Sequence, residues 1–358
     1  MKPASQRLLY LDWVRGFAAL IMLQGHVFNS FTRTDLRQGG PYVMSQFVGG
    51  MPPAIFLFLL GVTFAFLMDS QAKKGVPATG RWMASLRRSG YLFAAAFAFR
   101  LQMWLFSFDV NHWSDLFRVD ILNCMGLALL VMSVMAVFRT EERIRLCAIL
   151  GLAIAAASPL VSKLDWSATP EIVRHYVAPD YNFFGFFPWA AFVAFGLSAG
   201  SIFRLIKSDD VPTMMQWLAW GGVTVAFTAW SMSNMGVSIY SSAEFWLNSP
   251  ALVLIKLGAI MILLAFAWIW NIRATADQWN WVRQFGLTSL LVYWVHIELV
   301  YGRWFGSLKE QLSVGQTVVA TVITIALMLG LSLLRTNWPQ VKAYVTNGGP
   351  IPRRVPGD

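Results

Sequence analysis

The stretch DWVRGFAALIMLQGH, residues 12–26, decides the fold class and raises the question of function. Most of it is apolar enough for the core of a membrane, yet it carries an arginine near one end and a histidine at the other. On a helix, Arg15 and His26 point within about 20° of each other and lie about 16 Å apart along the axis. Ionisable groups at membrane depth are costly and usually face a cavity or a partner. One face of this predicted helix is therefore a candidate functional face.

The whole chain has the composition of an integral membrane protein. Of its 358 residues, 57% are hydrophobic and 13% are charged, whereas soluble domains hold about 45–50% apolar and about 25% charged residues. A helix that crosses a bilayer needs about 20 mostly apolar residues. Such runs predict an all-α polytopic bundle of about ten transmembrane helices, at residues 10–31, 52–68, 89–107, 119–138, 146–162, 183–203, 214–232, 249–270, 284–302 and 314–334.

The lysines and arginines predict how this bundle is oriented. Most of them fall in segments on the same side as the N-terminus, and cytoplasmic loops are enriched in these residues. Both termini are therefore predicted to be cytoplasmic. The same bias accounts for the net charge of +10 without nucleic acid as a partner. Residues 1–335 are expected to form one transmembrane domain, and residues 336–358 a disordered cytoplasmic tail.

Several polar side chains gather toward the outer side of the predicted bundle. Asn29 follows His26 on a neighbouring part of its face. His112 lies in an outer loop, and His296 and Glu298 lie in the outer half of the ninth predicted helix. Plainer interpretations stay open, with His26 as an interhelical hydrogen-bonding group and His112 as an ordinary loop residue. The functional interpretation places the chemistry of the protein among these residues.

Two arginines within predicted helices need partners. Arg15 has a plainer interpretation as an interfacial arginine that pairs with Asp12, three residues before it. Arg100 lies beyond the midplane of the third predicted helix, so it requires a carboxylate or water. Asp120 and Glu298 are both candidates for that carboxylate.

Two further polar groups lie at opposite sides of the bundle. The sequence RVDILN opens the fourth predicted helix on the outer side, where Arg118, Asp120 and Asn123 would line a polar mouth. An aspartate near a helix start is also ordinary capping chemistry. On the cytoplasmic side, a basic rim would bind a phosphorylated molecule or simply set the topology. This rim comprises the lysines of AKKG, Lys73 and Lys74, together with Arg81, Arg87 and Arg88.

Five stretches, taken in order, resemble the membrane acyltransferase superfamily, and in particular its heparan-alpha-glucosaminide N-acetyltransferase-like branch and the acyltransferase-3 proteins. The first is the stretch quoted above, extended to Leu11, and the others lie in later predicted helices. The five are LDWVRGFAALIMLQGH, PPAIFLFLLGVTFAF, RVDILNCMGLALL, FPWAAFVAFGLSAG and LLVYWVHIELVYG.

The resemblance implies an enzyme that moves an acyl group, expected to be acetyl, from cytosolic acyl-CoA to a hydroxyl or amine of a sugar or glycan on the other side of the membrane. His26 is then the general base or a covalent acyl carrier, and His296 is a second acid/base or a group that binds the acceptor. Asn29, Asn123 or Arg118 would stabilise the oxyanion or orient the sugar. Arg15 and the basic rim would hold the CoA phosphates. Arg118, Asp120 and Asn123, together with His112 and Glu298, would bind the acceptor. An activated thioester requires no metal.

A transporter or flippase for a small anionic or lipid-linked sugar is the alternative, because a buried arginine and histidine on one face also suit a coupled transporter. The family resemblance and the lack of paired broken helices count against it. The expected partners are membrane lipid, acyl-CoA and a sugar acceptor, and homo-oligomerisation stays open. The expected location is a bacterial inner membrane.

Overall fold

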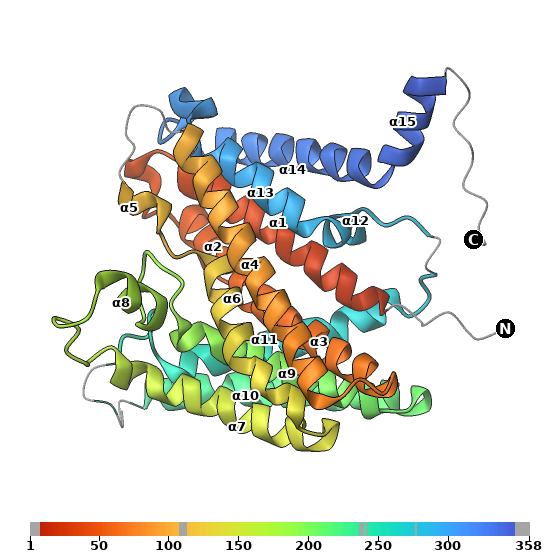
Figure 1. Ribbon diagram of the computed structural model, residues 1–358. Helices are drawn as coiled ribbons and strands as arrows, with labels where there is room; N and C mark the ends of the chain where they lie inside the picture. Colours follow the sequence, from red (N-terminus) through yellow and green to blue (C-terminus); the bar gives the residue numbers. More distant parts are fainter. Residues whose placement is uncertain (1–7, 107–112, 236–239, 241–242, 276–277, 348–358) are drawn as a thin grey trace. The chain divides into compact units, whose positions relative to one another are not determined.

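The computed structural model describes residues 8–106, 113–235, 240, 243–275 and 278–347 (Figure 1). Over these residues the chain is helical, and a single isolated bridge of extended backbone joins Thr32 to Leu312. The chain divides into two compact units. Unit 1 comprises Met1–Pro52 and Phe266–Asp358, and unit 2 comprises Pro53–Ala265. Unit 1 is thus built from both ends of the chain.

Each of the ten predicted segments contains a helix. Nine segments correspond to one main helix each, and the segment at 284–302 corresponds to two. The helices are α1 (Leu9–Phe31), α3 (Pro52–Lys73), α4 (Ala78–Phe106), α6 (Ile121–Met132), α7 (Thr140–Val161), α9 (Phe186–Leu205), α10 (Val211–Asn234), α11 (Pro250–Asn271), α12 (Trp281–Leu287), α13 (Ser289–Tyr301) and α14 (Val314–Thr336).

Five helical stretches of the described chain are long and apolar enough to cross a membrane. The chain is therefore an integral membrane protein, while the full number of crossings stays a prediction. The five stretches are Gly40–Lys73, Thr140–Val161, Phe186–Leu205, Pro250–Asn271 and Val314–Thr336.

Helices also occur where the sequence predicted loops or disorder. α2 (Gly40–Gly49) and α8 (Glu171–Val177) lie in the two predicted outer loops, and α15 (Trp338–Asn347) lies in the tail for which disorder was expected. These helices are too short or too polar for a search of membrane-length apolar runs to find. The remaining short elements are η1 (Thr34–Leu36), α5 (Trp113–Leu116), η2 (Ser133–Val137), η3 (Ser208–Asp210) and η4 (Arg303–Leu308).

Two helix boundaries differ from the predicted ones for physical reasons. α4 begins at Ala78 rather than at residue 89, because its first turns carry polar helix-forming residues that an apolar scan ignores. The segment at 284–302 is broken at Thr288, which leaves the helical region with φ −124° and ψ 21°. The Thr288 hydroxyl forms a short hydrogen bond to the hydroxyl of Ser332 on α14. A side-chain partner therefore accompanies the break.

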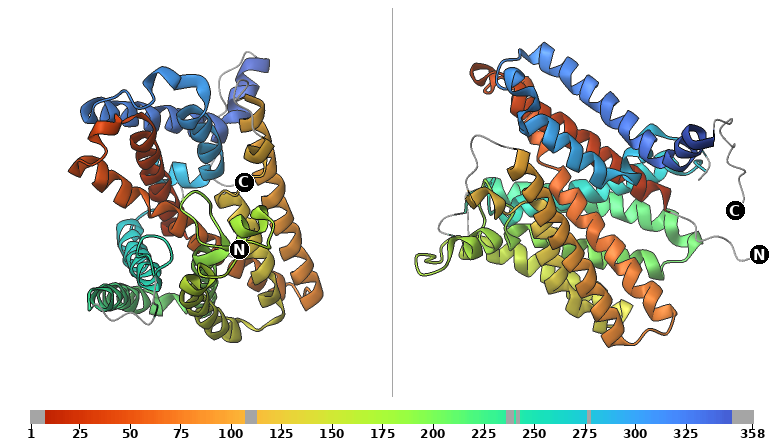
Figure 2. Two further views of the ribbon diagram at one scale, coloured as in Figure 1. Left: turned by 90° about the vertical axis from the view of Figure 1, so that its left-hand side faces the viewer. Right: turned by 45° about the horizontal axis from the view of Figure 1, so that its top comes forward.

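In unit 1, α1 runs alongside α12, α13 and α14 (Figures 1 and 2). Two glycines allow α1 and α12 to touch through their backbones. A Cβ on Gly16 would lie 1.7 Å from the carbonyl oxygen of Val282, and one on Gly286 would lie 2.0 Å from that of Asp12. No side chain fits at either position, so these glycines set the distance between the two helices.

In unit 2, α9 packs against α3 in the same manner. A Cβ on Gly196 would lie 1.9 Å from the carbonyl oxygen of Phe58, and one on Gly200 would lie 2.8 Å from Val62. The small residues of GLSAG, at the end of the fourth motif, therefore form a packing face.

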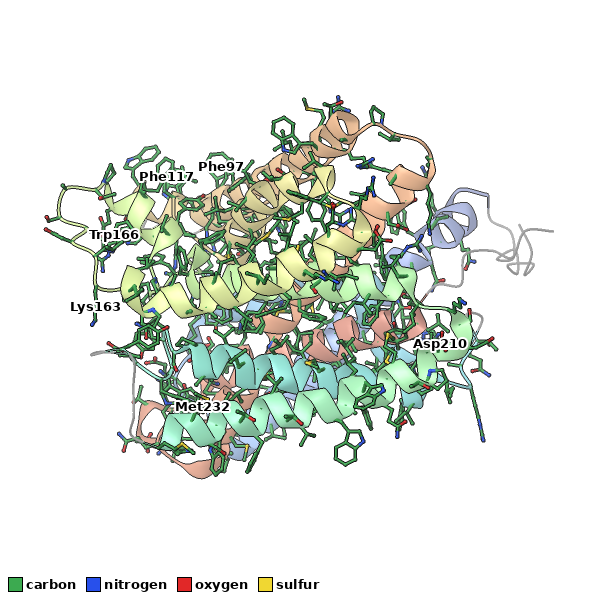
Figure 3. All side chains as sticks on the ribbon, turned by 90° about the horizontal axis from the view of Figure 1, so that it is seen from below. Phe97, Phe117, Lys163, Trp166, Asp210 and Met232 are labelled. Carbon is green, nitrogen blue, oxygen red and sulfur yellow. The ribbon has the colours of Figure 1, made fainter. Side chains whose placement is uncertain are left out.

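Two long helices of unit 2, α7 and α10, begin at the same end of the unit. Figure 3 shows Asp210, which precedes α10, at one end of the unit, and Met232, near the end of α10, at the other. Lys163, which follows α7, lies at the same end as Met232. α7 and α10 therefore run in the same direction, and both begin at the Asp210 end.

Candidate functional site

Two histidines that lie far apart in the sequence form a hydrogen-bonded pair in unit 1. Nδ1 of His26, on α1, lies 2.9 Å from Nε2 of His296, on α13. Their rings are nearly parallel, with 14° between the planes. His296 is fully buried, with 0% of its surface exposed, whereas His26 is half-buried. The pair therefore has an inner member and a more accessible member.

The hydrogen bonds of the pair decide which ring nitrogens carry protons. Nδ1 of His296 lies 2.7 Å from the carbonyl oxygen of Val292, and a carbonyl can only accept, so this nitrogen carries a proton. Nε2 of a neutral His296 is then an acceptor, and Nδ1 of His26 donates to it. The other nitrogen of His26, Nε2, is left unprotonated. His26 therefore presents the atom that a general base needs.

Contacts at the end of α1 hold this pair in place. The Ser30 hydroxyl donates to the carbonyl of Val300 at 2.8 Å, and the backbone amide of Leu312 donates to the carbonyl of Phe31 at 2.9 Å. Val27, Phe31 and Val300 form a buried apolar cluster. The C-terminal ends of α1 and α13 are therefore fixed against each other on the side of the histidines.

Asn29 follows His26 by about one turn and is held by two tyrosines. The Tyr42 hydroxyl donates to its Oδ1 at 3.1 Å, and its Nδ2 donates to the Tyr301 hydroxyl at 3.1 Å. The Tyr301 ring meets His26 edge-on, with 5.4 Å between ring centres. Because Nδ2 carries two N–H bonds, Asn29 keeps one donor besides the one that Tyr301 accepts.

Sequence reasoning missed three residues of this neighbourhood. They are Tyr301, Tyr42 and Arg37, whose Nη2 donates to the carbonyl of Asn29 at 3.0 Å. Tyr301 closes the same motif as His296 but is five residues away, about 140° around a helix. Spacing therefore gave no reason to group the two. Tyr42 and Arg37 lie in the predicted outer loop, where no pattern marked them.

Arg15, on the same predicted face of α1 as His26, is paired. Its Nη1 lies 3.3 Å from Oδ1 of Asp12, so the pairing that the plainer interpretation predicted is confirmed. The Arg15 side chain still keeps 25% of its surface exposed. The ion pair therefore leaves part of the guanidinium accessible to a ligand.

Glu298, two residues after His296, lies in different surroundings. Its Oε1 accepts from the indole N–H of Trp304 at 3.0 Å. Its Oε2 is buried and has no hydrogen-bond partner among the described residues. Glu298 and His296 are two residues apart on α13, so they lie on different sides of the helix and have different partners. Oε2 of Glu298 therefore keeps an unused capacity to accept a hydrogen bond.

The polar group predicted at the start of the fourth segment lies in unit 2 and is largely used by the fold. Oδ1 of Asp120 caps α6 by accepting from two backbone amides, at 3.0 and 3.4 Å. Its Oδ2 lies 3.0 Å from Nε of Arg100, so Asp120 is the observed carboxylate partner of that arginine. Asn123 donates to the Tyr176 hydroxyl at 2.8 Å. Capping and ion pairing therefore occupy both oxygens of Asp120.

The other outer candidates are more loosely placed. Arg118 is exposed, donates to the carbonyl of Asn182 at 3.4 Å and lies over the Phe183 ring at 5.7 Å. His175, on α8, stacks on the same Phe183 ring, with 3.8 Å between ring centres. His112 lies outside the described residues, so its role stays a prediction.

The arginines of the predicted basic rim lie on a helix rather than in a loop. Arg81, Arg87 and Arg88 all belong to α4. Arg81 is anchored, because its Nε donates to the carbonyl of Ala136 at 3.1 Å and its Nη1 to that of Val76 at 3.0 Å. Arg87 and Arg88 are exposed. The three arginines therefore differ in how firmly they are held.

Comparison with known protein families gives one match. The family described as "Heparan-alpha-glucosaminide N-acetyltransferase, catalytic" matches residues 7–240 of the chain. The match contains four of the five motifs quoted above, whereas the motif at 290–302, with His296, lies beyond it. Among the curated proteins, none matches the chain.

Proposed function

Because the chain belongs to the family of heparan-alpha-glucosaminide N-acetyltransferase catalytic domains, we propose that it moves an acetyl group from cytosolic acetyl-CoA to a sugar on the other side of the membrane. The acetylated group is a hydroxyl or an amine of a glycan or lipid-linked sugar. The family match and the apolar helices make the chain a membrane protein of an acetyltransferase-like family. The proposal concerns the identity of the donor, the identity of the acceptor and the direction of transfer.

The histidine pair is the observation that carries this proposal. Acyl transfer needs a base beside the acceptor, and a second group that orients the base. Nε2 of His26 is unprotonated, and His296 holds the opposite side of the ring through a hydrogen bond of 2.9 Å. His296 is in turn fixed by the carbonyl of Val292. This arrangement favours His296 as a positioning residue over the second acid/base that the sequence suggested.

In the proposed transfer, His26 alone accepts a proton and later returns it. Nε2 of His26 accepts the proton of the acceptor hydroxyl or amine while its oxygen or nitrogen attacks the acetyl carbonyl carbon. A C–O or C–N bond forms, and the C–S bond of the thioester breaks. The His26 imidazolium then returns the proton to the departing sulfur. Covalent acetylation of His26 is the variant of this scheme, and it differs by ping-pong kinetics.

Other polar groups have proposed roles in the same reaction. The remaining N–H of Asn29 stabilises the oxyanion that forms at the acetyl carbonyl, while Tyr42 and Tyr301 hold the amide in place. The unpartnered carboxylate oxygen of Glu298 accepts from a sugar hydroxyl. Arg118 and Asn123 also contact the acceptor, and Asp120 supports them as the cap of α6.

Arginines are proposed to bind the phosphates of the donor, since a guanidinium matches phosphate geometry. Arg81 fits this role best, because two backbone carbonyls hold it in one orientation. The partly exposed Arg15 and the exposed Arg87 and Arg88 supply further positive charge. Acetyl-CoA provides an activated thioester, so no metal is needed.

The proposed topology has about ten crossings and both termini in the cytoplasm. It rests on the ten helical segments and on the distribution of lysines and arginines. The proposed location is a bacterial inner membrane. The proposed partners are membrane lipid, acyl-CoA and the sugar acceptor. A second copy of the chain, in a homo-oligomer, stays an alternative partner.

Sealed inside-out vesicles test the proposed function. Acetyl-CoA labelled in the acetyl group is added outside, where it reaches only the cytoplasmic face. Label is expected to become covalently attached to lipid or glycan inside the vesicles, and vesicles without the protein serve as the control. Uptake of a sugar without any acetyl transfer would instead favour the transporter.

A substitution at His296 separates positioning from acid/base chemistry. His296→Leu removes the acceptor of the His26 Nδ1–H bond and is expected to lower kcat by about ten- to a hundredfold, because a hydrogen bond to a charged group contributes about 1.5–3 kcal/mol. KM for acetyl-CoA should change little. His296→Asn, which keeps an acceptor oxygen, should recover part of the loss. Equal activity of His296→Leu and the unmodified protein would remove the pair from the mechanism.

A further inference from the structure

A cavity in unit 2 gathers positive charge. It has a volume of about 300 Å³ and lies among the end of α3, the start of α4 and the segment that leads into α7. Three of its lining residues are arginines, Arg81, Arg139 and Arg143, and one is a carboxylate, Glu141. The lining is therefore cationic, although Glu141 opposes the charge in part.

Arg143 is the unusual member of this cavity. Only 1% of its surface is exposed. Among the described residues, one of its five side-chain N–H donors is used, by Nη2, which donates to the Thr140 hydroxyl at 3.0 Å. Its Nε is buried with no hydrogen-bond partner in the part of the chain that the structure describes. A buried guanidinium with so few partners is costly. The protein therefore holds a strong donor in place without satisfying it.

The nearby carboxylate does not neutralise Arg143, because other groups already occupy it. Oδ2 of Asp69 lies 2.7 Å from Nε of Arg204 and 3.2 Å from Nζ of Lys73. Its Oδ1 accepts from the Thr140 hydroxyl at 3.4 Å. Asp69 is thus shared between two cations and a hydroxyl. Over the described residues, Arg143 has no carboxylate within ion-pairing distance, so its charge is available to an anion.

We propose that this cavity, with Arg143 at its wall, is a phosphate-binding site. Arginine suits phosphate because its planar donors match two phosphate oxygens. Arg81 is anchored by two backbone carbonyls, and Arg139 is exposed at the edge. The phosphate is that of the acyl donor, whose nucleotide carries a 3′-phosphate, or that of an anionic lipid headgroup. The assignment to the donor rests on the proposed function, whereas the phosphate site itself does not.

Equilibrium binding to the purified full-length protein tests the site. The probes are CoA without an acyl group, 3′-dephospho-CoA, inorganic phosphate, and micelles that contain phosphatidic acid. The variants are Arg143→Gln and Arg139→Gln, and the second keeps the proposal testable if the first fails to fold, because Arg139 is exposed. Arg145→Gln removes a charge from the same helix, at an exposed position that does not line the cavity, and serves as the control.

If the donor supplies the phosphate, each cavity variant should bind CoA at least about tenfold more weakly, while Arg145→Gln binds it normally. 3′-Dephospho-CoA should then bind the unmodified protein weakly, with no further loss in the variants. If lipid supplies it, the variants keep their affinity for CoA and lose binding of phosphatidic acid. Variants that bind CoA, inorganic phosphate and phosphatidic acid as the unmodified protein does would overturn the proposal.

This experiment does not depend on turnover, so its failure differs from failure of the proposed function. If the protein binds phosphate in the cavity but transfers no acetyl group in vesicles, the phosphate site is supported and the proposed enzyme activity is contradicted. If the protein transfers acetyl groups and both variants bind CoA and phosphate as the unmodified protein does, the enzyme activity is supported and the phosphate site is contradicted.

Discussion

Replacing His26 by alanine is expected to lower the rate of acetyl transfer by about a thousandfold, because a positioned general base contributes about 10²- to 10⁴-fold. Nε2 of His26 is the unprotonated nitrogen of the pair, and its neighbour His296 has its Nδ1–H committed to the carbonyl of Val292. His296 therefore cannot take over as the base without losing that hydrogen bond. The measurement is the transfer of labelled acetyl groups into sealed inside-out vesicles.

The binding of acetyl-CoA should survive the loss of His26, since the imidazole is assigned to proton transfer and not to the donor phosphates. His175→Ala is the matched control, because that histidine lies on α8 in unit 2 and stacks on Phe183. Label transfer by His26→Ala at the rate of the unmodified protein would remove this residue from the mechanism and leave the family assignment intact. Accumulation of acetylated His26 in the unmodified protein would favour the covalent variant.

Gly16→Ala is expected to destabilise the folded protein by at least about 3 kcal/mol, at the upper end of the usual cost of overpacking. The added Cβ would lie 1.7 Å from the backbone carbonyl oxygen of Val282, and a backbone atom cannot turn away as a side chain can. α1 and α12 would have to move apart. The measurement is the temperature at which the detergent-solubilised protein unfolds, together with its yield.

A glycine of α14 gives the control for this substitution. A Cβ on Gly330 meets no atom within 4 Å, so Gly330→Ala should be neutral or stabilise the helix by about 0.5–1 kcal/mol. Equal unfolding temperatures for Gly16→Ala and Gly330→Ala would show that α1 and α12 tolerate a wider spacing. A folded but inactive Gly16→Ala protein would show that the spacing matters for the histidine pair, since α13 follows α12 directly.

Sequence reasoning identified the helical segments because apolar runs of membrane length leave few other structures. It could not place a boundary that depends on polar residues, as at the start of α4. Nor could it see the break at Thr288, because hydropathy does not report where a side-chain hydroxyl finds a partner. Segments that are apolar on average are predictable, and their interruptions are not.

The candidate site was likewise predictable from the sequence only in part. His26 and His296 were each predicted to lie toward the outer side, but their hydrogen bond depends on the packing of α1 against α13, which no spacing reveals. The partner of Arg100 was narrowed to two carboxylates, and the structure selects Asp120. No sequence pattern singled out Arg143. Its burial and its unused donors became visible only with the fold.

Unit 1 is built from both ends of the chain, and this has a consequence for biosynthesis. A ribosome delivers α1 to the membrane among the first helices and α13 among the last, and chains fold in the order of their synthesis where they can. His26 is therefore synthesised long before His296, the residue whose hydrogen bond fixes the tautomer of His26. A nascent chain released early, even one as long as the part that matches the family, would contain the base without the group that orients it. On the proposed chemistry, the synthesis and insertion of α13 is the step that completes the catalytic pair.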